Sequence, residues 1–192
     1  MKILFIHGLA SSGAYKMAST LRILFKEAEV IAPDVPIEPH DALNLLLGIC
    51  RDEQPDLIVG HSLGGYWAQK LRGWRKVLVN PELHVSRFLR PRIGVMEYLS
   101  PRRDGALSFE ITEQICDGYE LLERTEFDGL TQEEIGLTSA LFADKDELVD
   151  SYAEFEGHYP GRGRRYPGGH FPNFNQVKEY VFPVMEQELE KR

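Results

Sequence analysis

Short apolar runs alternate with longer amphipathic segments along this chain. Residues 2–6, 57–60 and 76–80 are largely apolar runs of strand length, each followed by a turn containing glycine, serine or proline. Such runs are typical of strands buried on both faces of a sheet. Between them, residues 15–26 and 41–50 carry apolar side chains at helical spacing. This alternation predicts parallel strands joined by right-handed helical crossovers.

The pattern predicts one α/β domain over residues 1–192, with about six mostly parallel strands and helices on both faces. Asp41 is predicted to be the N-cap of the second helix. Ligands are expected beyond the carboxyl ends of the strands. The remaining predicted elements are strands at 30–32, 137–143 and, more weakly, 163–167, and helices at 62–73, around Tyr152 and Phe155, and at 177–189.

The alternation is interrupted between residues 81 and 136. Pro91 and Pro101 break the first half of this segment, and the second half is acidic and mostly of helical character. Residues 131–134, with the sequence Thr-Gln-Glu-Glu, fit a capping box. The segment is therefore predicted to be a small helical cap inserted into the domain. Its helices are expected at 110–124 and 131–135. It also carries a group of arginines, at positions 87, 90, 92, 102 and 103.

The third predicted strand runs into the pattern Gly-x-Ser-x-Gly at residues 60–64, and a helical segment follows. Glycine and serine are common, so the five letters alone are a weak signal. A strand before the motif and a helix after it are what the nucleophile elbow requires, because its turn is too tight for side chains at Gly60 and Gly64. The context therefore favours Ser62 as an exposed nucleophile over a serine in an ordinary glycine-rich loop.

A serine hydroxyl is a weak nucleophile at neutral pH and needs a base, which in turn needs an orienting carboxylate. His170 follows the last predicted strand and Asp146 follows the strand before it. The order serine, aspartate, histidine is that of the α/β hydrolases. Asp144 is the rival acid, and His158, which precedes the last strand, is the weaker rival base. His40 and His84 are expected at the surface.

A tetrahedral intermediate also needs donors for its oxyanion. The backbone amide of Leu63 opens the helix of the elbow, and the amide of Leu9 lies in the loop after the first strand. These two amides are the predicted oxyanion hole. His7 is expected to hold that loop by hydrogen bonds rather than to act as a base.

Composition is ordinary for a soluble globular protein, with 43% hydrophobic and 27% charged residues. The net charge of −8 argues against general binding to nucleic acid or to an anionic membrane. Residues 3–6 are too few for a signal-peptide core or a membrane span, so a cytoplasmic location is expected. Cys50 and Cys116 lack metal-ligand spacing and are expected to be buried free thiols, not parts of a disulfide or metal site.

These motifs together resemble the small bacterial YqiA/YcfP-like esterases of the α/β-hydrolase superfamily. The resemblance runs in order from residue 6 to 171 and is loose through the insert. It rests on His7-Gly8, the elbow 60–66, Val79-Asn80-Pro81, Asp146-Glu147 and Gly168-Gly169-His170. It implies a serine esterase without metal or organic cofactor, and it points to Asp146 rather than Asp144. His61 departs from the family pattern, because many members have serine at this position.

Three functions follow as hypotheses. The first is hydrolysis of small carboxylic esters through acylation of Ser62, and a thioesterase acting on an anionic acyl thioester is a close variant. The insert arginines could attract such a substrate, although a basic cluster is more often a solvated face. The second is a non-catalytic binding module on the same fold. The third is acyl transfer or lyase chemistry on the same residues. The sequence leaves substrate-binding residues, leaving group and oligomeric state open.

Overall fold

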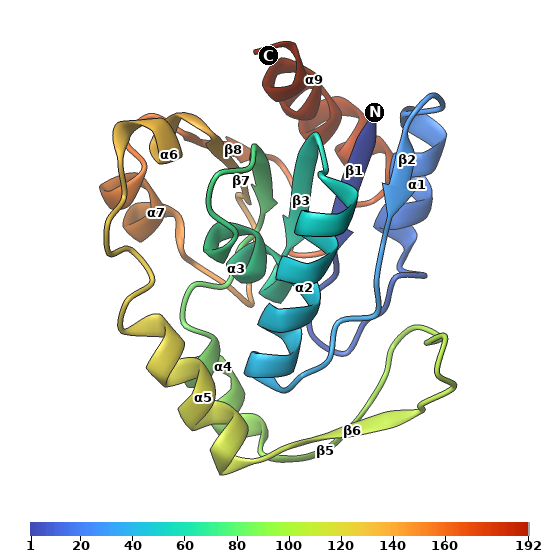
Figure 1. Ribbon diagram of the computed structural model, residues 1–192, viewed down its shortest axis with the longest axis vertical. Helices are drawn as coiled ribbons and strands as arrows, with labels where there is room; N and C mark the ends of the chain where they lie inside the picture. Colours follow the sequence, from blue (N-terminus) through green and yellow to red (C-terminus); the bar gives the residue numbers. More distant parts are fainter. Residues whose placement is uncertain (192) are drawn as a thin grey trace.

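The computed structural model describes residues 1–191. Its centre is a parallel sheet with the strand order β2-β1-β3-β4-β7-β8 (Figure 1). The strand order reverses between β1 and β3: the chain after β1 continues to β2 on one side of the sheet, and the chain after β3 continues to β4 on the other. All six predicted strands are present, including the weak last one. They are β1 (Lys2–Ile6), β2 (Glu29–Ile31), β3 (Leu57–His61), β4 (Lys76–Val79), β7 (Thr138–Ala143) and β8 (Gly163–Tyr166).

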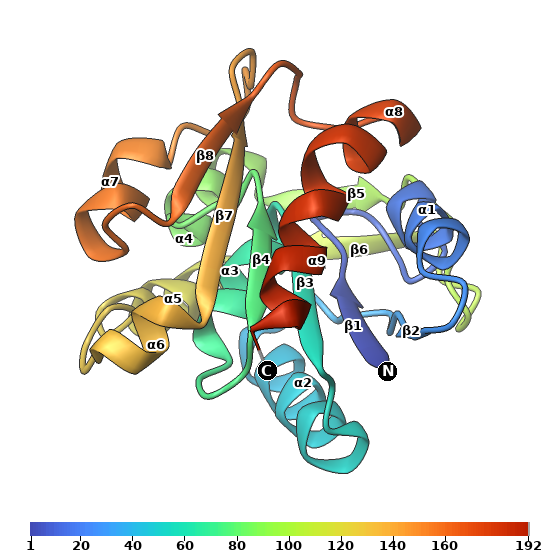
Figure 2. The same ribbon diagram turned by 90° about the horizontal axis from the view of Figure 1, so that it is seen from above.

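Helices cover both faces of this sheet (Figure 2), as the alternation predicted. The helices are α1 (Lys16–Leu24), α2 (Pro39–Glu53), α3 (Leu63–Lys70), α4 (Val85–Leu89), the 3-10 turn η1 (Arg90–Arg92), α5 (Glu113–Glu123), α6 (Gln132–Gly136), α7 (Tyr152–His158), α8 (Phe174–Gln176), the π-helical segment η2 (Val177–Val181) and α9 (Phe182–Glu190). Along β1 the side chains alternate between the two layers, because successive residues of a strand point to opposite faces. Ile3 and Phe5 pack with α1 and α9, whereas Leu4 and Ile6 pack with α2 and α3.

The insert between β4 and β7 is not wholly helical. It contains a two-stranded antiparallel sheet, β5 (Gly94–Glu97) with β6 (Ser108–Ile111), which extends away from the main sheet (Figure 1). The helix expected from residue 110 therefore begins at Glu113, with Thr112 as its N-cap. Leu99 N donates to the backbone oxygen of Ala10 at 2.7 Å, which ties the hairpin to the loop after β1. This hairpin is the main feature of the insert that the apolar pattern did not indicate.

Two helix starts differ from expectation. Helix α2 begins at Pro39, and its N-cap is Glu38, whose carboxylate accepts the amide hydrogen of Asp41 at 2.7 Å. Asp41 is thus inside the first turn and is not the cap. The last helical segment begins at Phe174 instead of residue 177, because Asn173 and Gln176 form a capping box there.

The capping box predicted at residues 131–134, at the start of α6, is only half formed. Thr131 accepts the amide hydrogen of Glu134, as predicted, but the Glu134 carboxylate turns to the buried ammonium of Lys76 at the start of β4. Its second oxygen accepts the amide hydrogen of Gly73 at 2.9 Å. Burial lowers the pKa of Lys76 to about 8, against the opposing effect of Glu134. The pair joins the insert to the amino-terminal end of the sheet.

Cys50 and Cys116 are buried and free, in agreement with the sequence. Burial raises the pKa of the Cys50 thiol to about 11, so this group is an inert part of the core at neutral pH. Within residues 1–191, no helix combines the length and apolar character needed to cross a membrane.

Candidate active site

Ser62 lies in a sharp turn between β3 and α3, with φ 57° and ψ −120°. A serine rarely adopts this strained conformation, so surrounding contacts must impose it. A Cβ atom on Gly60 would lie 2.1 Å from the backbone oxygen of Gly64, and one on Gly64 would lie 2.0 Å from that of Ile6. Both positions thus require glycine, and the predicted strand, turn and helix are present.

Three side chains from separate loops form a chain of hydrogen bonds at the carboxyl edge of the sheet. The Ser62 hydroxyl donates to His170 Nε2 at 2.9 Å, and His170 Nδ1 donates to Asp146 Oδ2 at 2.8 Å. A carboxylate can only accept, which assigns the ring proton to Nδ1 and leaves Nε2 as the acceptor. The fold thus brings together the serine, histidine and aspartate that their order along the chain suggested.

The rival residues Asp144 and His158 take no part in this chain of hydrogen bonds. Asp144 is exposed, and His158 at the end of α7 stacks on Phe127 with ring centroids 3.7 Å apart. His40 and His84 are exposed, as expected.

The Asp146 carboxylate is held from both sides. Its Oδ1 accepts the amide hydrogens of Leu148 at 2.9 Å and Val149 at 3.0 Å, while Oδ2 faces His170. Burial acts to raise the pKa of Asp146, but these hydrogen bonds outweigh it and hold the pKa below its ordinary value. Asp146 is therefore ionised at neutral pH and can orient the imidazole.

The backbone of His170 is positioned by two residues that sequence reasoning did not assign to the site. Asn80 Nδ2 donates to the His170 oxygen at 2.9 Å, and His61 Nε2 donates to the same oxygen at 2.8 Å. Burial and the neighbouring His170 lower the pKa of His61 to about 4, so His61 is neutral at neutral pH. The available signals were an asparagine ending a strand before proline and a histidine inside the elbow motif.

Asn80 reaches several parts of the sheet edge. It has φ 46°, and its Oδ1 accepts the amide hydrogen of Ala143 at 2.8 Å. Its Nδ2 lies 3.0 Å from the hydroxyl of Tyr166 at the end of β8. Asn80 thereby links the ends of β4, β7 and β8 beneath the histidine loop.

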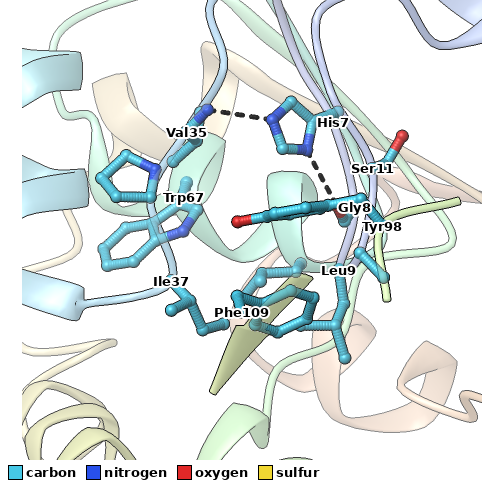
Figure 3. Close-up of a pocket in the computed structure, with 12 residues that line it drawn as sticks. His7, Gly8, Leu9, Ser11, Val35, Ile37, Trp67, Tyr98 and Phe109 are labelled. Carbon is cyan, nitrogen blue, oxygen red and sulfur yellow. Dashed lines mark hydrogen bonds between the residues drawn. The ribbon is translucent and has the colours of Figure 1, made fainter. Parts of the chain in front are cut away.

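A narrow, mainly apolar pocket of about 20 Å³ lies beside the elbow (Figure 3). Leu9 and Leu63 both line it, and no protein acceptor within residues 1–191 is bonded to the amide of either residue. Trp67 belongs to α3, and the hairpin contributes Tyr98 and Phe109, whose ring centroids are 4.7 Å apart. In Figure 3 these side chains converge on the same space. The hairpin thus forms one wall of the pocket.

His7 holds the loop that carries Leu9, as its position after β1 suggested. Its Nδ1 donates to the oxygen of Gly8 at 2.8 Å, and its Nε2 accepts the amide hydrogen of Val35 at 2.9 Å (Figure 3). Burial lowers the pKa of His7 to about 4. A neutral, doubly bonded ring suits a structural role.

The insert arginines do not form one cluster. Arg90 pairs with three acidic side chains of α5. Arg102 donates to the oxygens of Ser11 and Val35 at 3.4 Å, and Arg103 donates to that of Ala32 at 3.1 Å. These last two hold the hairpin against the loops after β1 and β2. Among the described residues, the guanidinium groups of Arg87, Arg92 and Arg103 have no carboxylate within 4.0 Å.

Comparison with solved structures identifies the fold. One of the metagenome-derived lipolytic enzymes LipS and LipT aligns with a TM-score of 0.65 and 11% identity, covering 100% of this chain and 94% of that one. The esterase domain of a Rhodothermus marinus protein aligns with a TM-score of 0.61 and 18% identity, covering 97% and 86%. A methylesterase from Arabidopsis aligns with a TM-score of 0.62 and 12% identity, covering 97% of this chain and 99% of that one. The chain therefore has an α/β-hydrolase fold.

Sequence comparison identifies the family. Residues 2–158 match the model of the uncharacterised protein family UPF0227, and the chain belongs to this family. This confirms the resemblance to the YqiA/YcfP-like proteins. A UPF0227 protein of Shewanella sediminis is 32% identical over 92 residues, 43% of this chain and 51% of the relative. One of Shewanella woodyi is 31% identical over 91 residues, 42% of this chain and 51% of the relative. The chain thus spans about half the length of these curated relatives.

Proposed function

We propose that this protein is a serine hydrolase that cleaves carboxylic esters of small acyl groups through an acyl-enzyme intermediate. The observation that carries the proposal is the chain of hydrogen bonds from Ser62 through His170 to Asp146, at 2.9 and 2.8 Å. The strained elbow supports it, because strain of this kind persists where it presents a functional side chain. The fold shared with known esterases is consistent with this chemistry.

In the proposed reaction His170 Nε2 takes the hydroxyl proton as Ser62 Oγ attacks the ester carbonyl carbon. The imidazolium that forms is stabilised by the ionised Asp146. Collapse of the tetrahedral intermediate breaks the bond to the leaving-group oxygen, which receives the proton from His170. Water then attacks the acyl-Ser62 ester with His170 again as the base, which releases the acid and restores the serine hydroxyl.

The amides of Leu9 and Leu63 are proposed to stabilise the oxyanion. Both are without a protein acceptor among residues 1–191, and Leu63 opens α3, where the helix dipole favours negative charge. Each such donor is worth about 3 kcal/mol of transition-state stabilisation in other enzymes. The bonds of His7 to the Leu9 loop would keep one of these donors in place before substrate arrives.

The narrow pocket beside these amides is proposed to take the acyl group. A free volume of about 20 Å³ is little more than a water molecule needs. It therefore favours acetyl over long acyl chains. The walls are Trp67 of α3 and the hairpin residues Tyr98 and Phe109.

A fluorophosphonate probe tests the nucleophile. Wild type should be labelled stoichiometrically and Ser62→Ala should not. Ser108→Ala, an exposed serine of β6, is the matched control and should label normally. Equal labelling of wild type and Ser62→Ala would contradict the proposal. An unlabelled wild type would favour a non-catalytic binding module instead.

Turnover of p-nitrophenyl esters and acyl-CoA esters of matched chain length then separates esters from thioesters. We expect higher kcat/KM for the oxygen esters and a preference for the shortest acyl group. Product analysis with competing nucleophiles distinguishes hydrolysis from acyl transfer.

A further inference from the structure

A second and much larger cleft, of about 400 Å³, is lined in part by residues that are hydrogen-bonded to Ser62 and Asp146. Glu82 is part of its lining, and the amide of Glu82 donates to the backbone oxygen of Ser62 at 3.2 Å. Leu148 and Val149 also line it, and their amides hold the Asp146 carboxylate. One part of the cleft wall is therefore built from residues bonded directly to the serine and the aspartate. None of these residues lines the narrow pocket at Leu9.

Arg87 and Arg92, two of the three insert arginines without a carboxylate partner, both line this cleft. Arg92 lies with its guanidinium carbon 3.9 Å from the ring centroid of Phe88, and its Nη1 donates to the Phe88 oxygen. These contacts orient the planar group and leave other donors available. Arg87 is exposed, and within residues 1–191 no carboxylate lies within 4.0 Å of it. The chain carries a net charge of −8, so two unpaired arginines in one cleft need an explanation.

Acidic groups in and around the cleft do not neutralise these arginines. Glu82 is buried and accepts the amide hydrogen of His84 at 2.7 Å. The ring of His84 bonds to Glu154 at 2.6 Å. Asp150 is exposed and forms no ion pair with an arginine of the described chain. Two arginines and one exposed carboxylate, that of Asp150, therefore face an entering ligand, so positive charge is in excess among these three groups.

We propose that this cleft binds the leaving-group half of the substrate and that Arg87 and Arg92 hold a carboxylate or phosphate on it. The assignment rests on the proposed hydrolase function. His170 must deliver a proton to the leaving-group oxygen, so the leaving group departs on the side of the histidine and aspartate loops. The cleft lies against the aspartate loop, while the narrow pocket at the proposed oxyanion donors is left for the acyl group. The substrate class is a short-chain ester of an anionic alcohol or phenol.

Two acetate esters with similar leaving groups test this assignment. The probe is 4-acetoxybenzoate, and its neutral counterpart is 4-acetoxybenzamide. We expect wild type to favour the anionic ester in kcat/KM by roughly five- to tenfold, the size of a charge-assisted contact in a partly exposed site. The ratio should fall to about one in the double variant Arg87→Gln, Arg92→Gln. It should stay at the wild-type value in Arg51→Gln, an exposed arginine of α2.

Further esters locate the charge. Monophenyl succinate carries its carboxylate on the acyl side, and a preference for it over 4-acetoxybenzoate would overturn the assignment. Preference for the cationic 4-(aminomethyl)phenyl acetate would overturn it as well. The ester 4-acetoxyphenyl phosphate distinguishes the two anions, with kcat/KM for each anionic ester divided by kcat/KM for 4-acetoxybenzamide. A higher ratio for the phosphate than for 4-acetoxybenzoate identifies a phosphate site, and a lower ratio identifies a carboxylate site. A wild-type ratio of one for both anionic esters refutes the proposal.

A binding measurement separates this proposal from the proposed function. Calorimetry with 4-acetoxybenzoate is carried out on Ser62→Ala, with and without the two arginine substitutions. Weaker binding after the arginine substitutions upholds the anion site, even if wild type turns over no ester. Unchanged affinity refutes the anion site, even if wild type is an efficient esterase.

Discussion

The side-chain amide of Asn80 donates a hydrogen bond to the backbone oxygen of His170 across 2.9 Å. His61 donates to the same oxygen, so the loop after β8 is held by residues that follow β4 and end β3. The imidazole of His170 is therefore positioned at both its backbone and its ring, where Asp146 binds Nδ1. This fixed geometry suits the base that we propose His170 to be, because a group held in place before substrate binds needs little reorganisation during a reaction.

Replacing Asn80 should slow the chemistry more than it weakens substrate binding. In Asn80→Ala the His170 loop loses a donor, and we expect kcat to fall on the order of tenfold to a hundredfold with KM little changed, because small displacements of a reacting group are costly. Steady-state kinetics with a p-nitrophenyl ester provide the measurement. Asn173→Ala is the control, since Asn173 caps α8 and its loss should lower stability by about 1 kcal/mol without lowering kcat. An unchanged kcat in Asn80→Ala would refute the positioning role.

The two candidate acids should differ sharply. In Asp146→Asn the amide can present the wrong partner to His170 Nδ1, and loss of the orienting carboxylate costs about 10⁴ in kcat in a comparable hydrolase. Asp144→Asn changes an exposed side chain and should keep kcat within about twofold, as most surface substitutions leave local structure intact. Turnover of both variants under saturating ester decides between them. A larger loss at position 144 would reverse the assignment.

The ionised Asp146 should also make stability depend on pH in the acid range. Its folded-state pKa lies below the ordinary value of 3.8, so the folded state binds the proton less well than the unfolded state. The stabilisation is fully present above that ordinary value and is lost as the pH falls through the folded-state pKa. Urea titrations of wild type and Asp146→Asn should therefore show a stability difference that shrinks below about pH 4. A difference that is constant with pH would contradict this view.

Opening the hairpin wall should lengthen the acyl chain that the protein accepts. Tyr98→Ala removes a ring from the narrow pocket, and we expect the ratio of kcat/KM for butyrate to that for acetate to rise by about tenfold, the value of one or two buried methylene groups. Leu107→Ala alters the same hairpin at a side chain that is 84% exposed and should leave the ratio unchanged. A series of p-nitrophenyl esters measures both. If the ratio does not move in Tyr98→Ala, the acyl group does not occupy this pocket.

The free energy of unfolding should fall more when the buried pair of Lys76 and Glu134 loses one partner than when it loses both. Glu134→Ala leaves an unpaired ammonium in the core, and we expect the free energy of unfolding to fall by about 3–5 kcal/mol. The double variant Lys76→Met, Glu134→Leu removes both charges and should lie much closer to wild type. Chemical denaturation monitored by tryptophan fluorescence gives these values. A double variant less stable than Glu134→Ala would show that the pair itself is strongly stabilising.

Local patterns predicted most of the sheet. Strands such as 57–60 are short apolar runs bounded by turn residues, and this signal depends only on neighbouring positions in the chain. The elbow is equally local, because Gly60, Ser62 and Gly64 lie within one turn. The strand order of an α/β fold then placed His170 and Asp146 at the edge that carries Ser62.

The hairpin β5–β6 and the separate fates of the arginines were not predictable in this way. The strands of the hairpin are short and Ile111 is their only buried residue, and β6 runs directly into a helical segment. Arg90 and Arg92 are two residues apart, yet one meets the acids of α5 and the other the ring of Phe88. Which partner each arginine finds depends on how α4 packs against α5.

The sequence by itself determined the strands, the elbow and the order of serine, aspartate and histidine, since each depends on short-range periodicity or on the topology that periodicity implies. Only the tertiary structure decided how the His170 backbone is held, which arginines remain unpaired and how narrow the pocket at Leu9 is. These properties come from contacts between segments far apart in the chain; Asn80 and His170, for example, are separated by 90 positions. Side-chain packing selects such contacts, and no local pattern encodes them.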